Sequence, residues 1–251
     1  MNVYLVRHGQ QEYELAAGFD LSLVNDYATA AKQGPLTARG RGEADAVARY
    51  LSGIGITNLY SSDLIRARQT AAATAALLGL EVRVTADLAE IRCGRLLPET
   101  SPRIAASLAL TRLVHAALSL VSSGAASVAA GGSLIRLYYN AWKSEETSDG
   151  ETVAAVRERV TRVLESLAAA HNDGDSVACF THGYFIYYTV NELLFPELRV
   201  RNVLTRPYLR NGSVTHLRRT AGQWSLVSYG ASQHLASRDG RLSRSRRGLA
   251  R

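Results

Sequence analysis

Cysteine is scarce in this chain of 251 residues, which carries only Cys93 and Cys179. Two cysteines are too few for a disulfide framework, and their spacing is not that of a metal-binding pair. Cys179 lies in an apolar run and is expected to be an inert, buried thiol. No charged and then apolar leader precedes the first predicted strand. We therefore expect a reduced, cytoplasmic location.

Net charge is also low outside the C-terminal end. The formal charge is +7, but residues 236–251 hold six arginines against one aspartate, so +5 lies there and only +2 elsewhere. A body this close to neutral lacks the basic footprint of a dedicated nucleic-acid-binding protein, so no obligate nucleic-acid partner is expected. The end segment is rich in Arg, Ser and Gly without an apolar pattern, which predicts a disordered tail. Contact of this tail with RNA, a membrane surface or an acidic partner is the alternative.

Strongly apolar runs are missing as well. Residues 113–135 carry no formal charge and are long enough to cross a membrane, yet the stretch is weakly hydrophobic and contains His115, several serines and Gly131-Gly132. We expect no membrane span. The segment from about 97 to 149 is instead predicted to be a helical insertion that covers one side of a sheet. Its apolar faces could also hold a homodimer partner or roof a pocket.

Strand and helix patterns alternate along the rest of the chain. Strands are predicted at 2–7, 58–60, 82–85 and 176–181, and helices at about 38–53, from a Ser61-Ser62-Asp63 cap to 78, at 151–170 and at 183–194. Thr37 is the expected N-cap of the first helix. This alternation indicates βαβ units and a largely parallel sheet.

The last two strands, 212–219 and 224–228, are joined by a turn around Gly222, which predicts an antiparallel pair at one edge. The expected fold is therefore α/β, a three-layer sandwich with a mostly parallel central sheet, one antiparallel edge and flanking helices. We expect a single domain over 1–235, interrupted by the insertion at 97–149 and followed by the tail at 236–251.

Arg7-His8-Gly9 follows the first strand and is well suited to meet a phosphate. The glycine lets a ligand approach the backbone N–H groups closely. The guanidinium of Arg7 matches phosphate oxygens, and a neutral imidazole at His8 can attack phosphorus. Alone, the triplet could also be an ordinary charged turn.

Thr181-His182-Gly183 repeats this arrangement after the apolar strand 176–181. Ligands of open parallel sheets bind outside the carboxyl ends of the strands. If the two strands are neighbours, His8 and His182 would therefore meet in one pocket.

Several further motifs occur in a recognisable order. They are Leu5-Val6-Arg7-His8-Gly9-Gln10, Pro35-Leu36-Thr37, Ser61-Ser62-Asp63-Leu64-Ile65-Arg66-Ala67 with Thr70-Ala71, Leu88-Ala89-Glu90, Gly150-Glu151, Thr181-His182-Gly183 and Asn211-Gly212-Ser213-Val214. This order resembles that of the histidine phosphatase superfamily, also called phosphoglycerate mutase-like. The resemblance covers about four fifths of the chain and excludes the insertion and the tail.

The resemblance implies that His8 accepts the phosphoryl group and becomes phosphohistidine. Arg7, Arg66 and a protonated His182 would surround the same phosphate. Phosphoryl transfer concentrates negative charge on the equatorial oxygens, so positioned cations of this kind can catalyse it without a metal or other cofactor.

Glu90 matches the position of the family's acid, which would protonate the leaving oxygen and then activate water. Asp87 and Glu99 are the reserve candidates for this role. Gln10 and Gly183 are further predicted phosphate contacts.

Two positions depart from the family pattern. Glu14 stands where many relatives carry an asparagine that touches the phosphate, and a carboxylate there would repel the ligand unless it turned away or were protonated. Tyr184 follows the second histidine-glycine pair, and its ring is placed to narrow the pocket or to stack on a substrate.

The leading hypothesis is a phosphomonoester hydrolase that acts on a small phosphorylated metabolite through phosphohistidine. One alternative is phosphoryl transfer of the phosphoglycerate mutase type, although the insertion does not resemble the charged, proline-rich one of the mutases. Another is a weakly catalytic phospho-ligand-binding or regulatory protein. The sequence does not identify the substrate.

Overall fold

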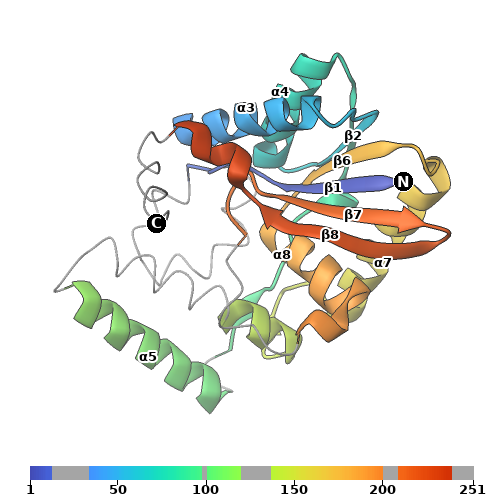
Figure 1. Cartoon of the computed structure of the whole chain (residues 1–251). Coiled ribbons are helices and arrows are strands. Elements are labelled where there is room, and N and C mark those ends of the chain that lie inside the picture. Colours follow the sequence, from blue (N-terminus) through green and yellow to red (C-terminus); the bar gives the residue numbers. More distant parts are fainter. Residues whose placement is uncertain (13–33, 98–100, 120–136, 200–208, 239–251) are drawn as a thin grey trace, which may run out of the picture.

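The computed structural model describes residues 1–12, 34–97, 101–119, 137–199 and 209–238. A six-stranded sheet forms its centre, in the order β3-β2-β6-β1-β7-β8 (Figure 1). The strands are β1 (Asn2–Arg7), β2 (Asn58–Ser62), β3 (Val82–Thr85), β6 (Ser176–Thr181), β7 (Val214–Thr220) and β8 (Gln223–Ala231). The first four in this order run parallel, whereas β7 is antiparallel to both β1 and β8. The predicted α/β fold with an antiparallel edge is confirmed.

Helices cover both faces of the sheet (Figure 1). They are α3 (Ala38–Ser52) and α4 (Ile65–Leu78) on one face, and α7 (Val153–Ala170) and α8 (Gly183–Tyr188) on the other. Successive residues of a strand point to opposite faces. Accordingly, Tyr4 and Val6 pack in the cluster beneath α3 and α4, while Val3 and Leu5 pack in the cluster that includes α7 and α8.

Local signals set several element ends. Thr37 caps α3, as predicted, because its side-chain oxygen accepts a hydrogen bond from Gly40 N at 2.9 Å. The predicted helix at 183–194 divides into α8 and a π-helical segment, η3 (Thr189–Leu194), followed by η4 (Pro196–Arg199). Ala221 and Gly222 form the tight turn between β7 and β8, with φ values of 48° and 82°.

Both cysteines are buried free thiols, as expected for Cys179. Burial raises the pKa of Cys179 to about 12. Burial also raises the pKa of Cys93, and the nearby carboxylates of Glu90 and Glu151 raise it further. Neither sulfur is therefore a ready thiolate.

The ends of the insertion lie side by side. A two-stranded ladder joins β4 (Arg95–Leu96) to β5 (Thr147–Ser148). The approach is close enough to require glycine, because a Cβ on Gly94 would lie 2.1 Å from the Ser148 carbonyl oxygen, and the φ of Gly94 is +75°. A larger residue there would be both crowded and strained.

Helix α5 (Pro102–Ser119) extends away from the sheet (Figure 1). Ile104 is fully buried, but Leu110 and Leu113 are 61% and 68% exposed. Apolar residues lie on more than one side of this helix, and Ile104 belongs to the core cluster that includes α7 and α8. The cover over a sheet face, expected of the insertion as a whole, stays a prediction. Residues 120–136 lie outside the described part of the insertion. No helix among the described residues is long and apolar enough to cross a membrane.

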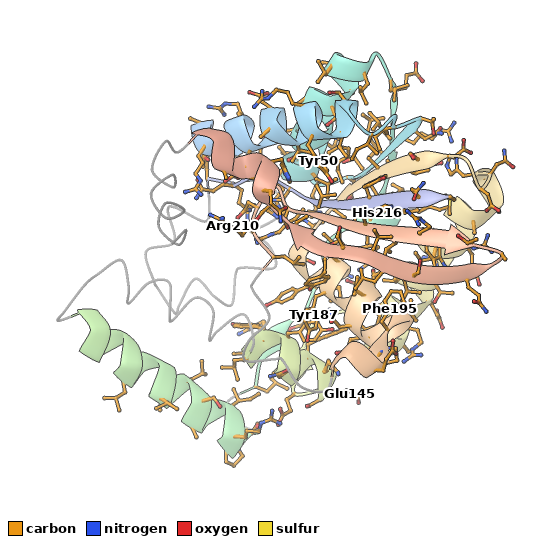
Figure 2. The ribbon with its side chains drawn as sticks, viewed as in Figure 1. Tyr50, Glu145, Tyr187, Phe195, Arg210 and His216 are labelled. Carbon is orange, nitrogen blue, oxygen red and sulfur yellow. The ribbon has the colours of Figure 1, made fainter. Side chains whose placement is uncertain are left out.

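The helical segment 137–143 of the insertion also joins the core. Tyr138, Tyr139 and Trp142 are buried there. The Tyr139 ring centroid lies 5.4 Å from that of Tyr184 and 5.0 Å from that of Tyr187, which Figure 2 labels on α8. The ring of Tyr184 therefore packs against the insertion.

The C-terminal end of the described chain is the helical turn η5 (Gln233–Arg238), which packs on α3. Residues 236–238 of the predicted tail belong to this turn, and residues 239–251 lie outside the described residues.

Candidate active site

The two predicted histidines meet at the carboxyl ends of neighbouring strands. In the β1/β6 ladder Arg7 pairs with Thr181, so the residues that follow them, His8 and His182, leave the sheet side by side. Their ring centroids are 5.1 Å apart, and both side chains are buried. The sheet register alone therefore brings together two residues that are far apart in the sequence.

One hydrogen bond fixes the tautomer of His8. Its Nδ1 lies 2.7 Å from the carbonyl oxygen of Gly9, which can only accept, so Nδ1 carries the hydrogen and Nε2 keeps its lone pair. Burial lowers the pKa of His8 well below its usual value, and the charges of Arg66 and Arg7 lower it further. The ring is therefore neutral at pH 7 and offers Nε2 as a nucleophile.

The backbone around His8 is held from several directions. Its N–H donates to the Thr181 carbonyl at 3.0 Å, and its own carbonyl accepts from Gly212 N at 3.1 Å. The N–H of Gly9 donates to the hydroxyl of Thr70 at 3.0 Å. These bonds join β1 to β6, to the loop before β7 and to α4.

Gly9 also permits a close approach between this loop and the start of α3. A Cβ added to Gly9 would lie 2.4 Å from the carbonyl oxygen of Gly40. A Cβ added to Gly40 would in turn lie 2.0 Å from the carbonyl oxygen of Gln10. Both positions therefore require glycine for packing, although neither has a positive φ.

Both predicted arginines are buried at the cluster. Arg7 is 3% exposed, donates from Nη1 to the Leu209 carbonyl, and lies against Gly183, where an added Cβ would be 3.5 Å from its Nε. Arg66, in the first turn of α4, is 2% exposed. Its backbone carbonyl accepts from the hydroxyl of Thr70 at 2.7 Å.

His182 forms a hydrogen bond with Ser62, with 2.9 Å between His182 Nε2 and Ser62 Oγ. Burial lowers the pKa of His182 strongly, and the charges of Arg66, His8 and Arg7 add to the effect. The expected protonated histidine is therefore neutral in this structure, because its surroundings are already positive.

Ser62 has a different role from the one expected. It is the last residue of β2, and α4 begins later, at Ile65, with no side-chain cap. Its hydroxyl accepts from Leu64 N at 3.2 Å and points to His182. The prediction of a Ser61-Ser62-Asp63 helix cap was wrong because the strand continues through both serines.

Glu90 faces the N-terminal end of α8. Its Oε1 accepts from Ile91 N at 2.9 Å and from Phe185 N at 3.0 Å, and its Oε2 accepts from Tyr184 N at 3.2 Å. Burial raises the pKa of Glu90. This effect is larger than the lowering of the pKa by these three N–H groups and by the charge of Arg66. A carboxyl group with a raised pKa keeps its proton to higher pH than usual.

Other predicted residues lie less centrally. The Oε1 of Gln10 accepts from the hydroxyl of Thr37 at 3.1 Å, so that end of the side chain contacts the start of α3. The carboxylate of Asp87 accepts two hydrogen bonds from Arg162 at 2.9 and 3.0 Å, and this pairing lowers its pKa. Glu14 and Glu99 lie outside the described residues. Among the described residues, no group of three or more His, Cys, Asp or Glu side chains could hold a metal ion.

Sequence reasoning gave no role in the site to Ser62, Thr70 and Arg159. Ser62 and Thr70 flank Arg66 in the chain, but only the fold shows that they contact His182 and Gly9. Arg159 did leave a signal, because it lies three residues after Val156 and four before Val163, on the apolar face of α7. A charged residue on an apolar helix face is almost never buried without a partner.

The sequence of the chain matches the model of a known family. Residues 3–117 and 132–232 match the histidine phosphatase superfamily (branch 1), and the chain belongs to it. A segment of 107 residues is 36% identical to the probable phosphoglycerate mutase GpmB of Serratia proteamaculans. That match spans 41% of this chain and 46% of the relative, less than half of either protein.

Solved structures of similar fold include two phosphatases. A mycobacterial glucosyl-3-phosphoglycerate phosphatase in complex with VO3 superimposes with a TM-score of 0.60 at 24% identity, covering 92% of this chain and 99% of that one. A phosphoserine phosphatase mutant from Entamoeba histolytica in complex with phosphoserine gives 0.59 at 20% identity, covering 93% and 98%. At these identities the likeness shows the fold alone.

Proposed function

We propose that the protein hydrolyses phosphomonoesters of small metabolites through a phosphohistidine at His8. The observation that supports this most is the arrangement of the buried rings of His8 and His182. They lie 5.1 Å apart at two strand ends, and the charges of Arg7 and Arg66 act on both. A tetrahedral dianion fits such a group of donors and cations.

In the first step, Nε2 of His8 attacks phosphorus, and the bond from phosphorus to the ester oxygen breaks. Glu90 gives its proton to that oxygen, so an alcohol leaves. The Gly9 carbonyl, which accepts from His8 Nδ1 at 2.7 Å, stabilises the positive charge that develops on the imidazole. The raised pKa of Glu90 favours a protonated acid at this stage.

In the second step, the Glu90 carboxylate takes a proton from water as the water oxygen attacks phosphorus. The P–N bond breaks, inorganic phosphate leaves, and His8 returns to its neutral form. Both steps place negative charge on the three equatorial oxygens, which Arg7, Arg66 and His182 would contact. A bound dianion would raise the pKa of His182 and oppose the effect of the arginines. Gln10 and Gly183 are proposed as secondary contacts, and no metal is required.

Labelling tests this scheme. The protein is mixed with a phosphomonoester that carries radioactive phosphate, quenched without acid, and digested to locate the label. We expect the label on His8 and none in His8→Ala. His216→Ala is the matched control, because His216 pairs with Asn2 on β1 away from the site and should leave labelling intact. Phosphate release at the normal rate by His8→Ala would overturn the covalent scheme, and absence of both release and labelling in the wild type would favour a binding protein.

Phosphoglycerate mutase activity is the second candidate, favoured by the 36% identical segment shared with GpmB. A mutase would pass the label from one phosphoglycerate isomer to the other and release little free phosphate. A hydrolase would release the phosphate. Following the label in a mixture of the two isomers separates the two activities.

A further inference from the structure

The backbone that leads to Glu90 is held by two buried side chains. The carbonyl oxygens of Asp87 and Ala89 both accept from Arg159 Nη1 at 2.9 Å. The carbonyl between them, of Leu88, accepts from the hydroxyl of Thr181 at 2.6 Å. Three successive carbonyls are therefore fixed by partners on α7 and β6.

The same arginine also reaches the far side of Glu90. Its Nε and Nη2 each donate to the carboxylate of Glu151 at 3.0 Å, and that carboxylate accepts from Arg92 N at 3.0 Å. The ion pair thus contacts the chain before and after Glu90. The side chains of Arg159 and Glu151 are 10% and 13% exposed.

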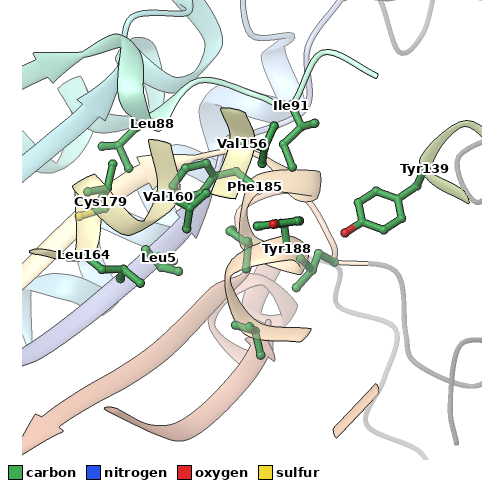
Figure 3. Packing of buried hydrophobic residues seen from close by; sticks show 14 of the residues in the cluster. Leu5, Leu88, Ile91, Tyr139, Val156, Val160, Leu164, Cys179, Phe185 and Tyr188 are labelled. Carbon is green, nitrogen blue, oxygen red and sulfur yellow. The ribbon is translucent and has the colours of Figure 1, made fainter. Parts of the chain in front are cut away.

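Arg159 also contacts the other support of the carboxyl group. Its guanidinium lies over the ring of Phe185, 5.8 Å from the centroid, and Phe185 N donates to Glu90. Leu88 and Ile91, on either side of Glu90, lie in the same apolar cluster as Val156 and Phe185 (Figure 3). The loop and the helix end that together hold Glu90 therefore share Arg159 as a neighbour.

We propose that Arg159 is a positioning residue for Glu90 and that its pairing with Glu151 sets how well Glu90 protonates the leaving group. The inference rests on the proposed function, in which Glu90 is the acid. A proton donor must lie within hydrogen-bond reach of the leaving oxygen, so a loop that relaxes would lose this step first. Binding of the phosphate by Arg7, Arg66 and His182 would persist.

The test exploits leaving groups of different basicity. Phenyl phosphate and para-nitrophenyl phosphate have similar shapes, but phenol needs protonation far more than para-nitrophenol does. In Arg159→Gln we expect kcat/KM for phenyl phosphate to fall about tenfold more than for para-nitrophenyl phosphate, a fraction of what a general acid contributes. A merely structural role would reduce both equally.

Three further single variants and one double variant complete the test. Arg162→Gln breaks the exposed pair with the Asp87 side chain on the same helix but leaves the carbonyl contacts, so it should behave like the wild type. Glu90→Gln should show the same split, and adding Arg159→Gln to it should cause no further split, because both act on one step. Thr181→Val removes the Leu88 contact without adding bulk and tests the loop if Arg159→Gln fails to fold.

The outcomes separate the two hypotheses. A split in Glu90→Gln with equal losses in Arg159→Gln, or in Thr181→Val if that variant is used, overturns the positioning role alone. No split in Glu90→Gln overturns the assignment of Glu90 as the acid, whatever Arg159 does. A wild type whose activity does not depend on His8 overturns the proposed function itself.

Discussion

His8 and Glu90 lie in one candidate site, but the chain holds them in different ways. His8 follows a central strand, and its neighbours Thr181 and Gly212 bind its backbone through main-chain hydrogen bonds. Glu90 lies in a loop between the turn η2 (Ala86–Leu88) and β4, where long side chains and the end of α8 hold it. The cationic end of the site, which holds His8, His182, Arg7 and Arg66, is thus built from sheet register and the start of α4. The acid end is built from contacts between side chains and a loop.

The largest effect is expected at the cationic end. Replacing Arg66 with Gln should lower kcat/KM for any phosphomonoester about 10³-fold, because a buried cation facing the equatorial oxygens is lost. Arg68→Gln is the matched control, since Arg68 is exposed on the same helix. Steady-state kinetics on both variants check this. Similar activity in the two variants would exclude a role for Arg66 in phosphate binding.

A change at the acid end should be smaller and should depend on pH. Glu90→Gln is expected to reduce kcat/KM about 10²-fold for substrates with a basic leaving group. The raised pKa of Glu90 means that the wild type keeps its acid protonated at low pH and loses activity as the pH rises through that pKa.

The kcat/KM of Glu90→Gln should not fall in this way as the pH rises, apart from the titration of the substrate, which is common to both proteins. Asp87→Asn is the control, because pairing with Arg162 lowers the pKa of Asp87 and its carboxyl is already ionised. Profiles of kcat/KM against pH check this. An unchanged alkaline limb in Glu90→Gln would assign the limb to another group.

A substitution at Gly9 tests how the close packing beside His8 contributes to the stability of the fold. Gly9→Ala places a Cβ 2.4 Å from the Gly40 carbonyl oxygen, where only main chain can move, so the free energy of unfolding should fall by about 1–3 kcal/mol. Gly174→Ala, with nothing within 4 Å of its Cβ, should change it by less than about 0.5 kcal/mol. Urea unfolding measures both, and equal stabilities would show that the loop and α3 can separate without cost.

The smallest effect is expected at Ser62. Ser62→Ala removes the hydroxyl 2.9 Å from His182 Nε2 while the strand continues to hold His182, so kcat/KM should fall about fivefold, equivalent to about 1 kcal/mol. Ser61→Ala is the control, because that buried hydroxyl donates to the Ser62 carbonyl. Kinetics at saturating and limiting substrate measure both. A larger loss in Ser61→Ala would mean that the strand end, and not the hydroxyl, is what His182 needs.

The sequence predicted the cationic end better than the acid end. The bounds of β1 and β6 follow from their apolar runs, and parallel pairing then places His8 beside His182. The sequence of helix α5 does not say which of its sides is covered, because apolar residues lie on more than one side of it. The role of Ser62 was misjudged because a serine before a helix has the same local signature as a cap.

The sequence by itself determined the succession of strands and helices along the chain, since periodicity and turn residues are local properties. It also determined which reactive side chains stand at the strand ends. Only the tertiary structure decided the tautomer of His8, the neutral state of His182 and the raised pKa of Glu90. It also decided that Arg159 would reach the Asp87 and Ala89 carbonyls, which are 72 and 70 positions away in the chain. Burial and contacts at such separations arise only when the sheet and its helices pack together, because they depend on neighbours that no local pattern encodes.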